Sequence, residues 1–275
     1  MNSLPPVART AYYCCLLRAT DAEGPNPLCG DRQAALFLDP GMRNELAPLL
    51  RFRGPSESNV ARHRLVDDLA REAITARPGQ RFFLIGAGFD TRAFRLPGGQ
   101  WWEFDDPGLL AVKELRLPAD QAPNRLARVG VDFAREGLAA HLAPLAGDDE
   151  AMVILEGVSM YLPDEALTAT AAAVRRALPR ATLVCDLMTG TFNRRFGGGI
   201  RRELGCLGAR FAPRAAHPRL AIEAAGFRVR HWTSIVNRAR EAGRLRIPAW
   251  LLATLLRELR DGYAVWVFEP NPEGP

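Results

Sequence analysis

Two glycines and several acidic residues stand at the ends of apolar runs, where such residue types can bind a polar ligand. The run RFFLI (81–85) leads into Gly-Ala-Gly (86–88) and then Asp90. A first glycine permits a sharp turn, and a second lets a ligand approach the backbone closely. A dinucleotide site usually has a third glycine, in the pattern G-x-G-x-x-G, but Thr91 stands at that position. The turn indicates a nucleotide-type ligand or a tight turn without one.

Acidic residues follow three later apolar runs. Asp105 comes about 20 positions after the glycines, where a carboxylate can accept hydrogen bonds from a ribose. Asp132 can accept a hydrogen bond from the amino group of an adenine, with Phe133 against the adenine ring. Glu156 ends an apolar run, so its charge must lie in a polar opening or be paired. The alternatives are solvated strand ends and an internally paired glutamate.

These residues need a sheet to bring them together, and the pattern of apolar runs predicts one. Short apolar runs alternate with helix-like segments from residue 81 onward, which is typical of an α/β protein with a mostly parallel, buried sheet. Helices are expected near residues 91–95, 107–117, 133–142 and 164–178. The expected strands are 81–85, 100–104, 126–131, 151–156, 181–188, 227–232 and 262–269.

The first 80 residues have the pattern of helices without strands. Apolar residues at helical spacing predict a long amphipathic helix over 58–77, with Ser58 as its cap. A shorter helix is expected over 6–19, followed by a Gly/Pro-rich loop over 20–30. An insert at about 189–216 contains three consecutive glycines and several arginines, and we interpret it as a mobile lid over a site.

Composition limits the possible partners. The chain has 275 residues, a net charge of +5 and a single lysine, Lys113, so nearly all its basic residues are arginines. This bias is typical of a GC-rich genome, so we expect no nucleic-acid partner. The five cysteines form no C-x-x-C pair, which predicts a reduced, cytoplasmic protein without a metal site. The apolar stretch 11–17 is too short for a membrane span, so no membrane contact is expected.

Four motifs together resemble the leucine carboxyl methyltransferase superfamily. They are LIGAGFDTRAFRL (84–96), EFDDPGLLAVK (103–113), VDF (131–133) and EGVSMYLPDEAL (156–167). The resemblance covers about residues 58–190, and GYAVWVFE (262–269) is similar to the family's last strand. Phe89 and Phe94 stand where the family usually has Leu and Tyr, and the second motif has Asp106 directly after Asp105.

The resemblance implies a class I methyltransferase that uses S-adenosyl-L-methionine. It implies a Rossmann-like, seven-stranded sheet of order 3-2-1-4-5-7-6 with strand seven antiparallel, in a domain over residues 81–275 with a helical cap over 1–80. Arg62 would pair with the cofactor's carboxylate, Asp105 with its ribose, and Glu156 would lie near its positive end. The cofactor-binding residues that the resemblance implies are Arg62, Gly86, Ala87, Gly88, Asp90, Asp105, Asp132, Phe133 and Glu156.

The implied reaction is O-methylation of a small molecule, a carboxylate or phenol of a polyketide-like secondary metabolite. Tyr12, Tyr13 and Tyr161 are candidates for contacting it, although packing is the favoured interpretation of each. His63 is one possible base, but an exposed helix position explains it as well. The acceptor, the base, O- versus N-methylation and the oligomeric state stay open. The alternatives are an NAD-dependent oxidoreductase and a non-catalytic basic module that binds RNA on the same fold.

Overall fold

Seven strands form one sheet in the computed structural model, which describes residues 6–133, 135–206, 208–212 and 217–272. The strands are β1 (Arg81–Ile85), β2 (Gln100–Asp105), β3 (Arg125–Gly130), β4 (Ala151–Leu155), β5 (Thr182–Met188), β6 (Phe227–Ser234) and β7 (Tyr263–Pro270). Their order is 3-2-1-4-5-7-6, and β7 is antiparallel to both of its neighbours. The predicted fold class, strand order and strand direction are therefore confirmed.

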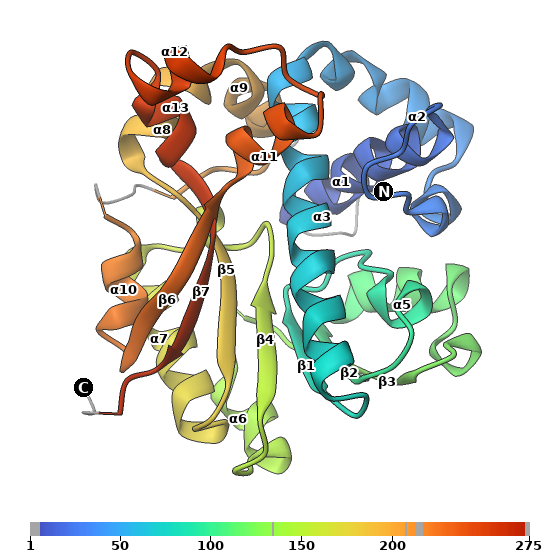
Figure 1. Ribbon diagram of the computed structural model, residues 1–275. Coiled ribbons are helices and arrows are strands. Elements are labelled where there is room, and N and C mark those ends of the chain that lie inside the picture. The colour runs from blue at the N-terminus through green and yellow to red at the C-terminus, as the bar shows by residue number, and fades with distance from the viewer. Residues whose placement is uncertain (1–5, 134, 207, 213–216, 273–275) are drawn as a thin grey trace.

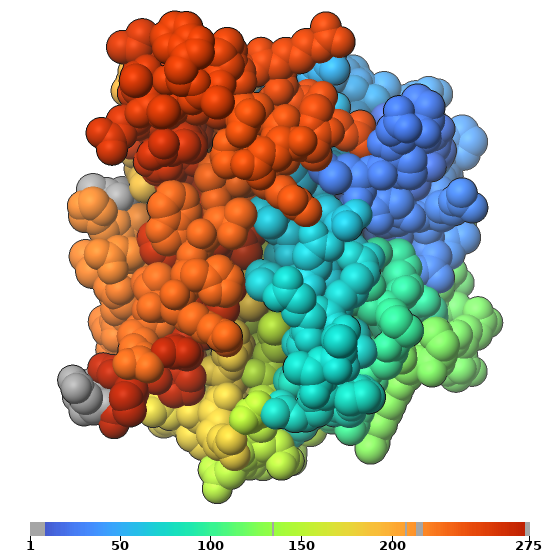
Figure 2. Space-filling model, viewed as in Figure 1, coloured from blue at the N-terminus to red at the C-terminus, as the bar shows by residue number. Residues whose placement is uncertain are grey.

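Helices cover both faces of this sheet because its central strands are apolar on both sides. Along β1, Phe83 and Ile85 pack on one face, whereas Phe82 and Leu84 pack on the other. The first face is covered by α6 (Ala139–Leu142), α7 (Asp164–Ala177) and α10 (Arg219–Glu223). The second is covered by α3 (Arg53–Ala76), α4 (Arg92–Arg95) and α11 (Ile235–Glu241), and α3 runs down the middle of the side shown in Figure 2.

The N-terminal helices form a third apolar cluster beside the carboxyl ends of the parallel strands (Figure 1). They are α1 (Pro6–Glu23), η1 (Arg32–Phe37), α2 (Pro40–Leu46) and η2 (Ala47–Arg51), and α5 (Pro107–Arg116) contributes Leu109. Helix α1 continues to Glu23, beyond the predicted end at residue 19. Helix α3 begins at Arg53, so Ser58 is buried inside it and the predicted cap is wrong.

The insert after β5 is helical and packs on this N-terminal cluster. It contains α8 (Gly190–Phe196) and α9 (Gly198–Cys206). Ile200 and Leu204 are buried in the cluster, and a Cβ on Gly199 would lie 2.7 Å from the ring of Phe52. The described residues of the insert lie beside the N-terminal helices. None of them lines the cavity at the carboxyl ends of the parallel strands that is described below. Its arginines Arg194, Arg195, Arg201, Arg202 and Arg210 are exposed.

The remaining elements are short connections. They are η3 (Ala119–Gln121), η4 (Ala143–Leu145), η5 (Ser159–Tyr161), α12 (Ala249–Ala253) and α13 (Arg257–Asp261). Within the described residues, no helix has both the length and the apolar character needed to cross a lipid bilayer.

Candidate functional site

A cavity of about 710 Å³ lies at the carboxyl ends of β1 to β4. All nine residues expected to bind a cofactor line it, although they come from five separate segments of the chain. They are Arg62, Gly86, Ala87, Gly88, Asp90, Asp105, Asp132, Phe133 and Glu156. Ligands of open α/β sheets bind at this position, beyond the strand ends where the strand order reverses. The structure therefore brings the predicted residues together around one site.

The glycine turn after β1 depends on both glycines. Gly86 and Gly88 have positive φ angles of 71° and 51°, which residues with a side chain rarely adopt. A Cβ on Gly86 would lie 2.4 Å from Cγ2 of Val158, so a larger residue would collide there. The backbone N–H groups of Gly86 and Ala87 donate to the carbonyl of Phe104, at 2.8 and 3.1 Å. These contacts tie the turn to β2 and leave its open side toward the cavity.

Asp105 fixes this turn from the end of β2. Its Oδ2 accepts the N–H of Gly88 at 2.6 Å, and its Oδ1 accepts the N–H of Asp106 at 2.7 Å. Burial raises the pKa of Asp105 above its ordinary value, and these two N–H groups oppose that rise. Asp106 caps α5 by accepting the N–H of Leu109 at 3.1 Å. Both carboxylates line the cavity, but Asp105 is the one bound to the glycine turn.

Asp132 and Phe133 form the outer edge of the cavity. The Asp132 side chain is 41% exposed, and Phe133 is 42% exposed. Both side chains are therefore open to solvent and also line the cavity. The pair can therefore offer a flat apolar face and a carboxylate to a ligand that enters from solvent.

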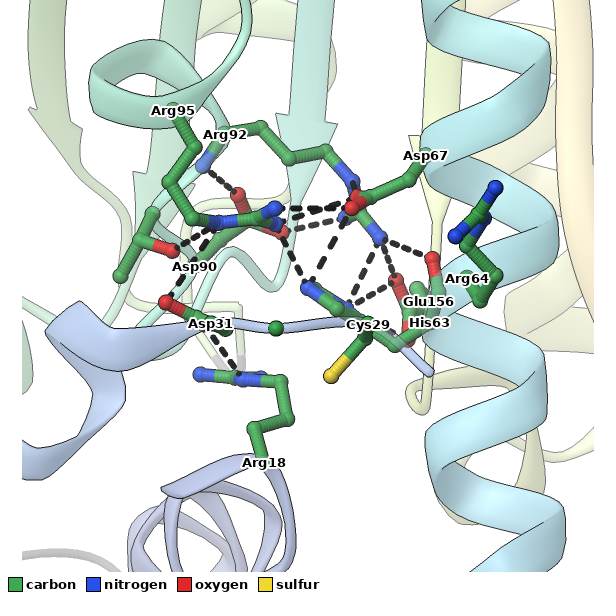
Figure 3. A network of polar contacts seen from close by, with 12 residues as sticks. Arg18, Cys29, Asp31, His63, Arg64, Asp67, Asp90, Arg92, Arg95 and Glu156 are labelled. Atoms are coloured by element: carbon green, nitrogen blue, oxygen red, sulfur yellow. Dashed lines mark hydrogen bonds and ion pairs between the residues drawn. The ribbon is translucent and has the colours of Figure 1, made fainter. Parts of the chain in front are cut away.

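Behind the glycine turn, the fully buried Arg92 is the centre of a network of charged side chains (Figure 3). Its Nε lies 2.8 Å from Oδ1 of Asp67, and its Nη2 lies 2.6 Å from Oε2 of Glu156. Its Nη1 pairs with Asp90. Burial opposes the charged form of Glu156, yet the nearby Arg92 holds the pKa of that carboxyl well below its usual range. Arg92 was not among the predicted site residues, although it belongs to the DTR motif.

His63 is buried in this network rather than exposed, so the predicted helix-surface position is wrong. Nη2 of Arg92 lies 2.9 Å from its Nδ1, and Nη2 of Arg95 lies 2.9 Å from its Nε2. Guanidinium groups only donate hydrogen bonds, and a protonated imidazole has no ring nitrogen that can accept one. The two arginines therefore disfavour the protonated form of His63. Burial and the charge of Arg92 therefore lower the pKa of His63, and the ring is neutral at neutral pH.

This lowered pKa predicts a loss of stability in mild acid. The unfolded chain binds a proton at His63 more tightly than the folded protein does, so stability falls as the pH drops below about 6.5. We expect the wild type to lose stability at this site between pH 7.5 and 5.5, by up to about 1.4 kcal/mol. Urea unfolding at both pH values measures it. His63→Gln should lose less between the two pH values, whereas His141→Gln, at a half-buried site, should behave like the wild type.

The same network fills a place that resembles a metal site. One ligand atom each from His63, Asp90 and Glu156 lie within 4.8 Å of one another. The Arg92 guanidinium contacts all three of these residues. It therefore supplies the positive charge at the point where the three side chains converge.

Arg62, on α3, connects the network to the cavity. Its Nε donates to Glu156 at 3.2 Å, and its Nη1 donates to Asp186 at 3.1 Å and to the hydroxyl of Tyr263 at 2.8 Å. The side chain is buried yet lines the cavity. Its partners Asp186 and Tyr263 were not predicted. Asp186 could have been noticed in the sequence, because it is an acidic residue inside the apolar run of β5.

Four arginines and four carboxylates are paired around Arg62 and Arg92, so their charges balance when the carboxyls are ionised. The arginines are Arg62, Arg71, Arg92 and Arg95, and the carboxylates are Asp67, Asp90, Asp186 and Glu156. Asp90 and Glu156 both line the cavity, and Glu156 is the one of the two that pairs with Arg62. A ligand with a positive charge at this point would be attracted by the nearby carboxylate of Glu156.

One face of α1 also lines the cavity, through Thr10, Ala11, Cys14 and Arg18. Tyr161, in η5 after β4, is another lining residue. Burial raises the pKa of Tyr161, so its hydroxyl stays protonated at neutral pH. The other two tyrosine candidates lie elsewhere. Tyr12 and Tyr13 are buried in the apolar cluster of the N-terminal helices, and neither is among the residues that line the cavity.

Solved structures with the same fold include a DUF574 family protein from Streptomyces avermitilis. It has 13% sequence identity and a TM-score of 0.63, over 93% of this chain and 96% of that one. The magnesium protoporphyrin IX methyltransferase of Synechocystis, solved with bound SAH, has 13% identity and a TM-score of 0.50, over 78% of this chain and 86% of that one. At these identities the similarity establishes the fold.

Sequence relatives identify the family. A protein from Streptomyces coelicolor is 33% identical to this chain over 174 residues, and it is named as an S-adenosyl-L-methionine-dependent methyltransferase. The match covers 58% of this chain and 60% of that protein. The model of the leucine carboxyl methyltransferase family matches residues 11–175, more than half of the sequence. The resemblance seen in the motifs is thereby confirmed, and this chain belongs to the leucine carboxyl methyltransferase family.

Proposed function

We propose that this protein transfers a methyl group from S-adenosyl-L-methionine to an oxygen atom of a small molecule. The observation that carries the proposal is the placement of nine predicted residues, from five chain segments, around one cavity at the strand ends. Family membership and the strand order support it. The cavity volume of about 710 Å³ lies within the range of small-molecule sites, about 300–1,000 Å³.

We assign the residues around the cavity to successive parts of this cofactor. Asp105, with two lone-pair positions left after its two N–H contacts, would accept hydrogen bonds from the ribose hydroxyls. Asp132 and Phe133 would contact the adenine at the exposed edge. The glycine turn would lie under the methionine part, and Arg62 would hold its carboxylate.

The cofactor would supply an electrophilic methyl group on a positively charged sulfur. The chain's own contribution is to hold the two reactants in line and to exclude water. Glu156 would lie near the positive part of the cofactor, because its carboxylate lines the cavity beside Arg62. Methyl transfer to an anionic oxygen consumes one positive and one negative charge, so a site shielded from water favours it.

The acceptor would approach from the side of α1, between Thr10, Cys14 and Tyr161. We favour a carboxylate, which is already ionised at neutral pH, over a phenol, which needs a base or a nearby cation. None of the four histidines is among the described residues that line the cavity. The protonated Tyr161 hydroxyl can donate a hydrogen bond that orients a carboxylate. A polyketide-like metabolite with such a group remains our proposed acceptor.

Calorimetry tests the cofactor assignment. We expect S-adenosylmethionine and S-adenosylhomocysteine to bind with micromolar affinity and NAD⁺ not to bind. Absence of binding by either sulfur ligand at millimolar concentration would refute the proposal, and tight binding of NAD⁺ would favour an oxidoreductase. Transfer of a radiolabelled methyl group to a panel of aromatic carboxylates and phenols then tests the acceptor class. Labelling of amines alone would contradict O-methylation.

A further inference from the structure

Two residues beyond the part of the chain that the family model matches hold Arg62 in place. Tyr263 is the first residue of β7, and Asp186 lies in β5, whereas the match ends at residue 175. Tyr263 and Asp186 are 6% and 1% exposed, and neither lines the cavity. Their polar atoms are nevertheless directed toward Arg62, which does line it. Tyr263 therefore reaches the site through the guanidinium, and Asp186 reaches it through the guanidinium and through the backbone of Gly157, which lines the cavity.

The three side chains form a closed triangle of hydrogen bonds. Nη1 of Arg62 donates to the Tyr263 hydroxyl at 2.8 Å and to Oδ2 of Asp186 at 3.1 Å. The Tyr263 hydroxyl donates to the same Oδ2 at 2.8 Å. Every side of the triangle is within hydrogen-bond distance, and the tyrosine uses its oxygen both as an acceptor and as a donor. The geometry fixes the orientation of the guanidinium plane as well as its position.

The contacts also determine which part of Arg62 remains for a ligand. Nε is occupied by Glu156, and Nη1 is occupied by the triangle. Nη2 lies against the backbone of Gly157, where an added Cβ would be 3.0 Å away. The backbone N–H of Gly157 donates to Oδ1 of Asp186 at 2.7 Å, so Asp186 holds both the arginine and the glycine next to it. Among these contacts, Nη2 is the nitrogen left to donate into the cavity.

We infer that Tyr263 and Asp186 are positioning residues that direct the Nη2 edge of Arg62 at the carboxylate of the cofactor's amino-acid part. This inference rests on the proposed function. It predicts that the pair acts on ligands that carry the carboxylate and does not act on the adenosine part alone. A purely structural role would affect both kinds of ligand equally.

The test compares two ligands on one variant. Tyr263→Phe removes only the hydroxyl and leaves the ring in its apolar surroundings. S-adenosylhomocysteine carries the amino-acid carboxylate, whereas 5′-methylthioadenosine has the same adenosine and sulfur without it. We expect the variant to bind S-adenosylhomocysteine about ten-fold more weakly, because a hydrogen bond to a charged group is lost. Its affinity for 5′-methylthioadenosine should stay within about two-fold of the wild type.

Asp186→Asn is a second variant, and it should show the same selective loss. Equal weakening of both ligands would assign the triangle to folding, and unchanged binding of both would show that Arg62 needs no support; either result overturns the inference. If the wild type binds neither ligand, the proposed function itself fails. Thermal unfolding of each variant without ligand shows whether the fold is intact.

Discussion

Arg92→Met is expected to destabilise the protein by at least about 4 kcal/mol. The change removes the cation that contacts Asp67, Asp90 and Glu156 together, so the buried Asp90 loses its Arg92 partner, whereas Asp67 keeps Arg95 and Glu156 keeps Arg62. Breaking a single buried ion pair costs about 3–5 kcal/mol, because the remaining charge has lost its partner. Total stabilities are about 5–15 kcal/mol, so the variant should retain only about 1–11 kcal/mol and unfold at a clearly lower urea concentration than the wild type.

Urea unfolding measures this effect, and two further variants make it interpretable. Arg180→Met removes an arginine that is 60% exposed and pairs with Glu150 at 2.7 Å, so the cost should be below about 1 kcal/mol. Arg92→Lys keeps a positive charge but cannot contact three groups at once, so its stability should lie between those of the wild type and Arg92→Met. An Arg92→Met protein as stable as Arg180→Met would show that the network does not hold the fold together.

Asp105→Asn is expected to weaken binding of S-adenosylhomocysteine by about 100-fold or more. The carboxylate accepts two backbone N–H groups of the turn and keeps two lone-pair positions for ribose hydroxyls. An amide replaces one oxygen by a donor, which would face an N–H group or a hydroxyl that needs an acceptor. Two hydrogen bonds to a charged group, at about 1.5–3 kcal/mol each, correspond to this loss of affinity or more.

Asp106→Asn is the matched control, since it changes the neighbouring carboxylate in the same way. Asp106 caps α5, and asparagine is an equally good cap, so both the fold and the affinity should change little. Calorimetry on the two variants therefore decides which aspartate binds the ribose. A larger loss for Asp106→Asn than for Asp105→Asn would transfer that role to Asp106.

Much of the architecture can be predicted from local patterns. The apolar runs ending at Ile85 and Leu155 indicate buried parallel strands, because such strands are covered on both faces. The Gly-Ala-Gly turn and Asp105 lie at strand ends, and carboxyl ends of parallel strands meet at one edge of a sheet. Strand direction alone therefore brings these residues together, and no knowledge of side-chain packing is needed.

Helix boundaries in the first 80 residues were harder to predict. Ser58 has the residue type of a helix cap, yet it is buried in the interior of α3. Helix α3 begins at Arg53 without a side-chain cap, and packing against the N-terminal cluster and the sheet stabilises it instead. Local capping signals cannot show this, since tertiary packing supplies most of a helix's stability.

The sequence by itself determined the strands, the glycine turn and the acidic residues at the strand ends, because these follow from spacings along the chain. Only the tertiary structure showed that His63 is buried, that Arg92 joins three carboxylates, and that Tyr263 reaches Arg62. Arg62 and Tyr263 are 201 positions apart. A buried charge is stable only beside its partners, and those partners come from whichever strands and helices the fold makes neighbours.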